Sequence, residues 1–389
     1  MKQNKVLPFI VISQFAGTSI WFVGNAVLPE LSHALDLPKQ GPGMISSAVT
    51  LGFVTGSLFS AISSLPDRFS PARLFFISAI LGAFSNLALI WFTHDRLDLF
   101  FWRFHTGFFL AVIYPIGMKI AADWYEQGLG KALGWLVGAL VIGSAFPYLL
   151  RDRTFDLPWQ TVLYITSAMA IAAGLLIQWL GDGPYRKTSG KFQWNAIPRI
   201  FSNKPWRKAA FGYFGHMWEL YTFWGFVPVI FAIYAAKHNH HLNIPLLSFL
   251  VIAAGGLSCI FGGYLVSRWG SERIARMALY ISGTCCLISP WIFQVSPVLF
   301  LFFIFIWGST VVADSPQFST LVAQLAAPEM RGTALTIYNS IGFLITSLSL
   351  FVMDALHHSD GPLGGEYSFL ILGLGMLIGN FPYKKIALR

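Results

Sequence analysis

The chain has too few charged residues to be surrounded by water. Asp, Glu, Lys and Arg make up 11% of its 389 residues, while 55% are hydrophobic. Soluble proteins carry about 25% charged residues, so much of this surface must meet lipid. Long apolar stretches alternate with short polar ones. Because a helix needs about 20 mainly apolar residues to cross a bilayer, this pattern predicts a polytopic membrane protein.

Twelve stretches are apolar and long enough to be transmembrane helices. Backbone polar groups in lipid must be satisfied within the segment, which favours helices over open strands. No small-residue cleavage site follows the first apolar run, so we expect that run to stay as a span. The expected spans are residues 7–31, 43–65, 73–93, 98–122, 131–150, 159–180, 209–236, 245–266, 273–293, 297–321, 332–354 and 367–383.

The basic residues predict the orientation. Of the 26 Lys and Arg residues, nineteen fall in segments on the same side as the N-terminus if the spans are right. Two lie within spans (Arg103 and Lys119), and five lie on the opposite side: Lys39, Arg96, Arg151, Arg153 and Lys237. Cytoplasmic loops are rich in Lys and Arg, so we expect both termini in the cytoplasm. The net charge of +9 is then a topology signal, and no nucleic-acid partner is expected.

The sequence contains an internal repeat. Asp67-Arg68 and Arg73 follow the second span, and Ser267-Arg268 and Arg273 follow the eighth at an offset of 200 residues. A second match, 130–133 against 332–335, has an offset of 202. Two related halves are therefore expected: a six-helix bundle at 1–180, a basic cytoplasmic linker at 181–208 and a second bundle at 209–389.

At these residues the sequence resembles the major facilitator superfamily. Its loop pattern G-x-x-x-D-R/K-x-G-x-R/K-R/K is matched at Asp67, Arg68 and Arg73, but serines replace both glycines. Arg103 and Gly107 are similar to the family's R-x-x-x-G pattern in the fourth helix. The resemblance implies twelve helices in two six-helix bundles around a central cavity. It also implies that helices 1, 4, 7 and 10 line this cavity, and that the gating residues are Asp67, Arg68, Arg73, Arg268 and Arg273.

The same four helices carry polar side chains on one face. In the first span, polar and aromatic residues recur at steps of four, three and four, which is helical spacing. Small polar residues also serve helix packing, so the Ser and Thr positions are ambiguous. The candidate substrate and proton-coupling residues are Gln14 and Asn25 in the first span, Arg103 and Tyr114 in the fourth, His216, Trp218 and Glu219 in the seventh, and Asp314 and Gln317 in the tenth.

Charged groups in these spans are the strongest functional candidates, because an ionisable group near the bilayer centre costs at least about 2.5 kcal/mol. Glu219 lies about eleven residues into the seventh span, near mid-membrane. It is expected either to carry protons or bind substrate, or to form a structural hydrogen bond, with His216 as one partner. Asp314 precedes Pro316, which should break the helix there. The alternative for Asp314 is a buried pair with a base from another helix.

These features predict a secondary active transporter of a small organic solute, working by alternating access and coupled to protons. Uptake is favoured because the family's antiporter element G-P-x-x-G-G is absent from the fifth span; proton-coupled efflux of drug-like or toxic compounds is the alternative. A membrane enzyme is disfavoured because no motif such as H-E-x-x-H occurs. We expect no cofactor and no metal, and a functional monomer in the lipid bilayer of a bacterial inner membrane.

Overall fold

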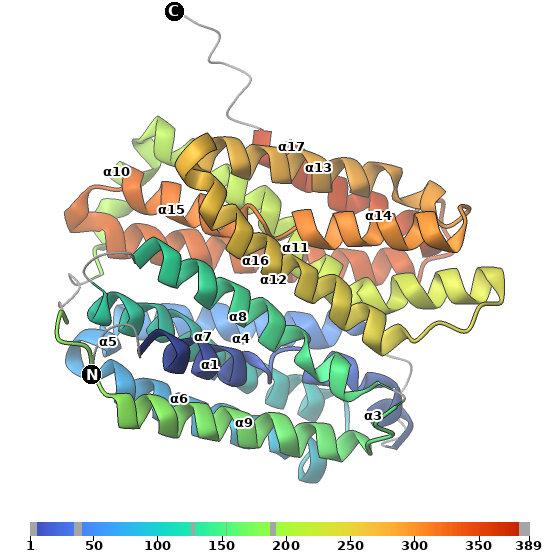
Figure 1. Cartoon of the computed structure of the whole chain (residues 1–389), viewed down its shortest axis with the longest axis horizontal. Helices are drawn as coiled ribbons and strands as arrows, with labels where there is room; N and C mark the ends of the chain where they lie inside the picture. Colours follow the sequence, from blue (N-terminus) through green and yellow to red (C-terminus); the bar gives the residue numbers. More distant parts are fainter. Residues whose placement is uncertain (1–5, 35–40, 126–128, 153, 187–191, 381–389) are drawn as a thin grey trace, which may run out of the picture. The chain divides into compact units, whose positions relative to one another are not determined.

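The computed structural model describes residues 6–34, 41–125, 129–152, 154–186 and 192–380. In these residues the backbone forms helices joined by turns and short loops, and no β-strand occurs among them (Figure 1). The predicted all-helical class is confirmed. The chain divides into two compact units. Unit 1 comprises residues 1–189 with 243–253, and unit 2 comprises residues 190–242 with 254–389.

Unit 1 holds the first nine helices. They are α1 (Val6–Thr18), α2 (Val23–Ala26), α3 (Leu28–Ala34), α4 (Pro42–Ile62), α5 (Leu65–Arg68), α6 (Pro71–Trp91), α7 (Arg96–Trp124), α8 (Leu129–Leu150) and α9 (Trp159–Leu180). Within the unit, α7 packs against α4 and α6, and α6 also packs along α9, as Figure 1 shows. The helix α1 lies against α7, α8 and α9.

Unit 2 holds most of the remaining elements. They are η2 (Trp194–Ala196), α10 (Ile197–Ser202), α11 (Lys204–His238), α12 (Ile244–Trp269), α13 (Ser271–Ile292), α14 (Pro297–Thr310), α15 (Ser315–Leu325), η3 (Pro328–Met330), α16 (Arg331–His357), η4 (Gly365–Gly373) and α17 (Leu374–Asn380). The long helix α11 packs against α15, α16 and α17, and α13 packs against α14, α15 and η4.

Nine helical segments of the described chain are long and apolar enough to cross a membrane. They coincide with nine of the twelve predicted spans. Of the other three, the first is divided among α1, α2 and α3, the ninth is α13, which begins with charged residues, and the twelfth is divided between η4 and α17. Nine of the twelve predicted spans are thus matched by such helices, and the other three correspond to shorter or more polar helical segments.

Helix starts follow local chemistry. Proline lies in the first turn of α4, α6, α11, α14 and α15, where its missing N–H has no cost. The Ser70 side chain accepts a hydrogen bond from the Arg73 N–H at the start of α6. Asn203 does the same for Trp206 at the start of α11. Such caps satisfy backbone donors that the first turn leaves free.

Two predicted spans are broken inside. The first span changes from α1 to α2 across Ser19–Phe22, and the tenth changes from α14 to α15 across Val311–Asp314. The second break was expected from Pro316, but the first has no proline near it. Irregular backbone at membrane depth occurs where it is buried in protein or lines a polar cavity. The backbone groups at both breaks therefore need hydrogen-bond partners from other helices.

The helices α4 and α7 approach through glycines. A Cβ atom at Gly107 would lie 1.9 Å from the Val49 carbonyl oxygen of α4, and one at Gly52 would lie 1.9 Å from the Phe104 oxygen of α7. The two backbones thus touch at both places, as small residues permit in membrane helices. This contact fixes the height and rotation of α7, and with it the direction of Arg103 one turn earlier.

A polar junction joins the end of α8 to the start of α12 within unit 1. The Asp152 carboxylate accepts hydrogen bonds from the Thr154 N–H at 2.8 Å and hydroxyl at 2.7 Å, and from the Asn243 amide at 3.2 Å. These donors, led by the Thr154 backbone, hold the pKa of Asp152 below its usual range. The Asn243 side chain also accepts from the Leu246 N–H in the first turn of α12.

Candidate functional site

In unit 1, Arg103 lies at the break of the first span. Its side chain is fully buried, and its guanidinium donates to the carbonyl oxygens of Ile20, at 3.3 Å, and Trp21. These carbonyls belong to the backbone between α1 and α2. The arginine therefore supplies donors to acceptors that lie at the end of α1, where the helix dipole favours a positive charge.

Gly24 makes this position possible. A Cβ atom there would lie 2.8 Å from the Arg103 Nε and 2.9 Å from an Ile45 methyl carbon, so a larger residue in α2 would push the guanidinium away. The Arg103 Nε finds no hydrogen-bond acceptor, and neither does the buried hydroxyl of Tyr148 in α8. No carboxylate within the described residues forms an ion pair with Arg103. The guanidinium is thus a buried cation without an acidic partner in this part of the chain.

The other unit 1 candidates have separate surroundings. Gln14 is fully buried against Gly117 of α7, and neither end of its amide has a hydrogen-bond partner. Asn25 donates to Ser46 of α4 at 2.8 Å and so joins α2 to α4. Tyr114 is half-buried on α7. Gln14 and Asn25 therefore lie in polar surroundings distinct from the backbone acceptors of the Arg103 guanidinium.

In unit 2, Glu219 is held by two neutral donors. Its side chain is fully buried on α11. One carboxylate oxygen accepts from the Trp307 indole N–H of α14 at 2.7 Å, and the other accepts from the Ser282 hydroxyl of α13 at 2.9 Å. Glu219 forms no ion pair within the described residues. His216, the partner considered from the sequence, lies against a different acid.

His216 instead meets Asp314. The His216 Nδ1 lies 2.7 Å from the Asp314 Oδ1, and both side chains are essentially buried. Asp314 is the residue directly before α15, at the break of the tenth span. The alternative considered from the sequence, an acid paired with a base from another helix, is the arrangement that the structure has.

Two further candidates of unit 2 lie beside these groups. The Trp218 indole N–H donates to the Ile371 carbonyl oxygen of η4 at 2.8 Å, so this side chain is directed at the last predicted span. Gln317 is buried one turn after Asp314, on the first turns of α15. Trp218 therefore has a packing partner distinct from the two acids.

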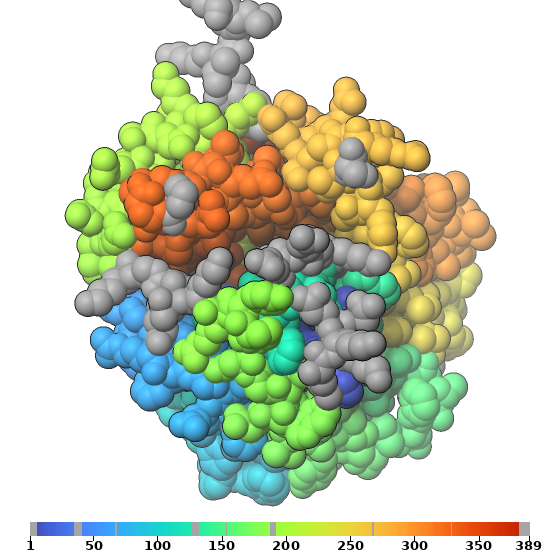
Figure 2. All heavy atoms as spheres, turned by 60° about the vertical axis from the view of Figure 1, so that its left-hand side comes forward, coloured from blue at the N-terminus to red at the C-terminus, as the bar shows by residue number. Residues whose placement is uncertain are grey.

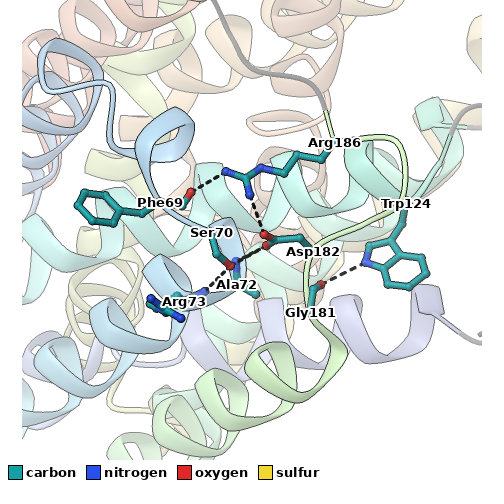
Figure 3. Close-up of polar contacts among 8 residues, drawn as sticks. All are labelled: Phe69, Ser70, Ala72, Arg73, Trp124, Gly181, Asp182 and Arg186. Atoms are coloured by element: carbon teal, nitrogen blue, oxygen red, sulfur yellow. Dashed lines mark hydrogen bonds and ion pairs between the residues drawn. The ribbon is translucent and has the colours of Figure 1, made fainter.

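The predicted gating loop lies between α4 and α6. Arg68 and Arg73 are exposed, and the side chain of Asp67 lies outside the described part of the structure. Figure 3 shows the neighbouring contacts: Asp182, just after α9, accepts from the Ser70 hydroxyl and the Ala72 N–H, both at 2.9 Å. Asp182 also pairs with Arg186 at 3.0 Å, and Arg186 donates to the Phe69 carbonyl oxygen.

The repeat of this loop in unit 2 joins α12 to α13. Figure 2 shows this connection at the surface of unit 2, in gold, and both Arg268 and Arg273 are exposed. The arginines of the sequence repeat are therefore exposed in both units. The polar network of Figure 3 belongs to unit 1.

Sequence reasoning missed four residues of these clusters: Tyr148, Asp182, Ser282 and Trp307. Trp307 lies in the apolar run 297–307 and resembles a core or lipid-facing residue. Ser282 is one small polar residue among several in its helix. Asp182 and Arg186 were grouped with the linker. A buried tryptophan needs an acceptor for its N–H, which is the one signal that pointed to a polar neighbour.

Comparisons with known proteins identify the family and the fold. Residues 10–350 match the family model of the Major Facilitator Superfamily. An uncharacterised protein of Campylobacter jejuni, Cj0987c, is 24% identical over 288 residues, which cover 72% of this chain and 87% of that protein. GudP of Escherichia coli K12, described as a probable galactarate/D-glucarate transporter, is 29% identical over 129 residues, covering 32% of this chain and 28% of GudP.

A solved structure has the same fold. The crystal structure of the human organic anion transporter MFSD10 (TETRAN) superposes with a TM-score of 0.73 over 99% of this chain and 100% of that one, at 14% sequence identity.

Proposed function

Since this chain belongs to the major facilitator superfamily, whose members are secondary transporters, we propose that it takes up a small organic anion together with protons. The membership confirms the resemblance seen in the sequence. It also confirms that the chain is an integral membrane transporter of a small solute and not a membrane enzyme. The coupling ion, the direction and the charge of the solute are the proposed parts.

The carboxylate of Glu219 carries the proposal of proton coupling. It is fully buried and its hydrogen-bond donors, Trp307 and Ser282, are neutral. A buried carboxylate without a cation is costly when ionised, and a proton is the simplest species that can remove its charge. Asp314, which pairs with His216 one turn before Glu219 on α11, is the second proton-binding acid of the proposal.

Arg103 supports an anionic solute. Its charge is buried beside the break of the first span and has no acidic partner within the described residues. A carboxylate forms strong, directional hydrogen bonds with a guanidinium, and discontinuous helices form substrate sites in many transporters. Galactarate and D-glucarate, the solutes named for GudP, are dicarboxylates, and MFSD10 is named as an organic anion transporter.

The orientation and the gate complete the proposal. Both termini lie in the cytoplasm, on the strength of the distribution of Lys and Arg, and the membrane is the bacterial inner membrane. Asp67, Arg68 and Arg73 in unit 1, with Arg268 and Arg273 in unit 2, control the change between states. Residues 1–180 and 209–389 act as the two halves, joined by 181–208, and the monomer is the working form.

Transport by purified protein in liposomes tests the proposal. With an inward proton gradient, labelled D-glucarate should accumulate and the neutral analogue D-glucitol should not. Glu219→Gln should abolish accumulation but preserve exchange of labelled for unlabelled solute, because exchange moves no net proton. Glu329→Gln, which changes an exposed carboxylate, is the matched control.

Each part of the proposal has its own contrary result. Undiminished accumulation by the Glu219→Gln protein rejects this residue as the proton carrier. Gradient-driven movement only in the outward direction replaces uptake with the efflux alternative. If the protein transports neutral or cationic solutes and no anion, the proposed anionic substrate is wrong, but the assignment as a transporter still holds.

A further inference from the structure

Two polar links cross from α11 to the tenth span, one on each side of its break. Glu219 bonds to Trp307, which lies in α14 before the break. His216 contacts Asp314, which ends the break and begins α15. Residues 216 and 219 are three apart and so share one face of α11. A single helix face therefore holds both segments of the broken helix.

The link to α14 is well defined. Trp307 is fully buried, and its ring lies 4.6 Å from that of Phe223, one turn after Glu219 on α11. The indole N–H can only donate, so it requires an acceptor such as the Glu219 oxygen. Ser282 of α13 fixes the second oxygen. The carboxylate thus bridges α11, α13 and α14.

The break itself is stabilised without a continuous helical ladder. Pro316 lies in the first turn of α15 and lacks an N–H. The carbonyl oxygen of Val312, which it cannot bond, accepts from the Ser315 N–H at 3.1 Å and from the Cys259 thiol of α12 at 3.3 Å. Between Thr310 and Ser315 the two segments are joined by turns, so the angle between α14 and α15 depends on their outside contacts.

We propose that Glu219–Trp307 and His216–Asp314 form a proton-controlled clamp on the broken tenth span, in which Trp307 and Ser282 are the positioning residues of Glu219. The clamp rests on the proposed proton coupling and adds to it a change in helix geometry when protons bind. When both acids are ionised, α14 and α15 are held against α11. Proton uptake loosens both links, and the angle at the break changes.

The chemistry of the links gives this direction. A hydrogen bond to a carboxylate is about twice as strong as one between neutral groups. When Glu219 gains a proton, Ser282 can rotate its hydroxyl to accept, but Trp307 cannot, so its bond becomes a neutral one. At the second link, a proton taken up by Asp314 removes the carboxylate charge that faces the His216 Nδ1 at 2.7 Å.

Few other titratable groups face the clamp. Cys285 and Cys286 of α13 are near Glu219, and Cys259 of α12 is near Asp314. The Tyr213 ring lies 5.6 Å from that of His216 on α11, and it stacks on Tyr338 of α16.

Distances between spin labels on α14 and α15 test the clamp. Phe302→Cys and Gln324→Cys place labels at exposed positions on the two segments. They are 22 residues apart, or about 33 Å along a straight helix, a range that pulsed electron paramagnetic resonance measures. The three native cysteines are buried and can remain. In liposomes, the distance distribution should change between pH 8 and pH 5.

Variants identify the groups responsible. Glu219→Gln should remove the part of the pH-dependent change that comes from the link to Trp307 and leave the part that comes from the His216–Asp314 link. Trp307→Phe keeps a ring but loses the N–H, so the transition should move to higher pH by about one unit, because a donor that favours the ionised carboxylate is gone. Ser282→Ala should move it in the same direction. Trp291→Phe, at an exposed tryptophan of α13, is the matched control and should move nothing.

The contrary results separate the clamp from the transport proposal. A distance distribution that is independent of pH, in protein that still accumulates solute under a proton gradient, overturns the clamp alone. Equal behaviour of the Trp307→Phe, Ser282→Ala and Trp291→Phe proteins overturns the positioning role. Absence of gradient-driven transport in the unmodified chain contradicts the proposed function, whatever the labels report.

Discussion

At the scale of single residues, the two buried charges in question are satisfied in opposite ways. Arg103 donates to backbone carbonyls at a helix break, while Glu219 accepts from neutral side chains. Neither is neutralised by an ion pair within the described residues. Charged groups in a membrane protein that have no fixed counter-charge are free to respond to a mobile one, either a solute or a proton.

For Arg103 we expect a graded loss. Arg103→Lys keeps the charge but loses the planar fork that matches a carboxylate, so the KM for D-glucarate should rise about tenfold or more. Arg103→Gln should abolish its transport. The measurement is initial uptake by liposomes, together with the thermal stabilisation that the solute gives to purified protein.

The control for Arg103 is Arg96→Gln, which removes an exposed arginine at the start of the same helix. Its KM should be unchanged. A folded Arg103→Gln protein with the KM of the unmodified chain would show that the arginine only supports the backbone of the first span.

Sequence reasoning selected the buried charges but not their partners. Arg103, Glu219 and Asp314 are conspicuous because ionisable residues are rare in apolar spans. Trp307, Ser282 and Tyr148 are ordinary residues for such helices, and which of them faces a given charge depends on the rotation and height of distant helices. Those are set by packing contacts such as the one between Gly52 and α7.

At the scale of elements, the breaks show what a hydropathy pattern can and cannot predict. Spans were expected at 7–31, without a break, and at 297–321, with a break near Pro316. Pro316 indicated the second break in advance, because a proline cannot donate the helical hydrogen bond to the residue four positions earlier. The break after Thr18 has no such marker. There, the Thr18 and Ser19 hydroxyls bond to carbonyl oxygens of the preceding turn, and Arg103 satisfies the carbonyls that follow.

The glycine contact of α7 with α4 makes a stability prediction. Gly107→Ala puts a Cβ atom 1.9 Å from a backbone oxygen, so the helices must separate, at a cost of about 1–3 kcal/mol. The apparent Tm in detergent should fall, and transport should fall with it because Arg103 moves. Gly134→Ala is the matched control: nothing lies within 4 Å of its added Cβ atom, and its Tm should stay the same or rise. Equal Tm values for the two variants would contradict the close contact.

At the scale of the whole molecule, composition predicted the class with little ambiguity. A chain with 11% charged residues must meet lipid, and lipid restricts the backbone to helices in spans of this length. The division of the chain into two units was predicted less well than the fold class. Residues 243–253 belong to unit 1, although they follow the linker, because Asn243 bonds to Asp152 at the end of α8.

Accessibility of single cysteines tests the predicted orientation. Ser202→Cys and His240→Cys lie at exposed positions in segments that the charge distribution assigns to opposite sides of the membrane. A maleimide that cannot cross membranes should label the second variant in intact cells and the first only in inverted vesicles. The buried native cysteines give a low background. Labelling of both variants from one side would contradict the predicted orientation.

The membership of residues 243–253 in unit 1 also limits how the gene can be divided. A cut between 187 and 208 separates the two predicted halves, but it leaves these residues on the second fragment. The first fragment then lacks part of its own unit, and the second carries the start of α12 without Asp152. We therefore expect that neither fragment folds stably alone, and that the two assemble only when both are made in one cell.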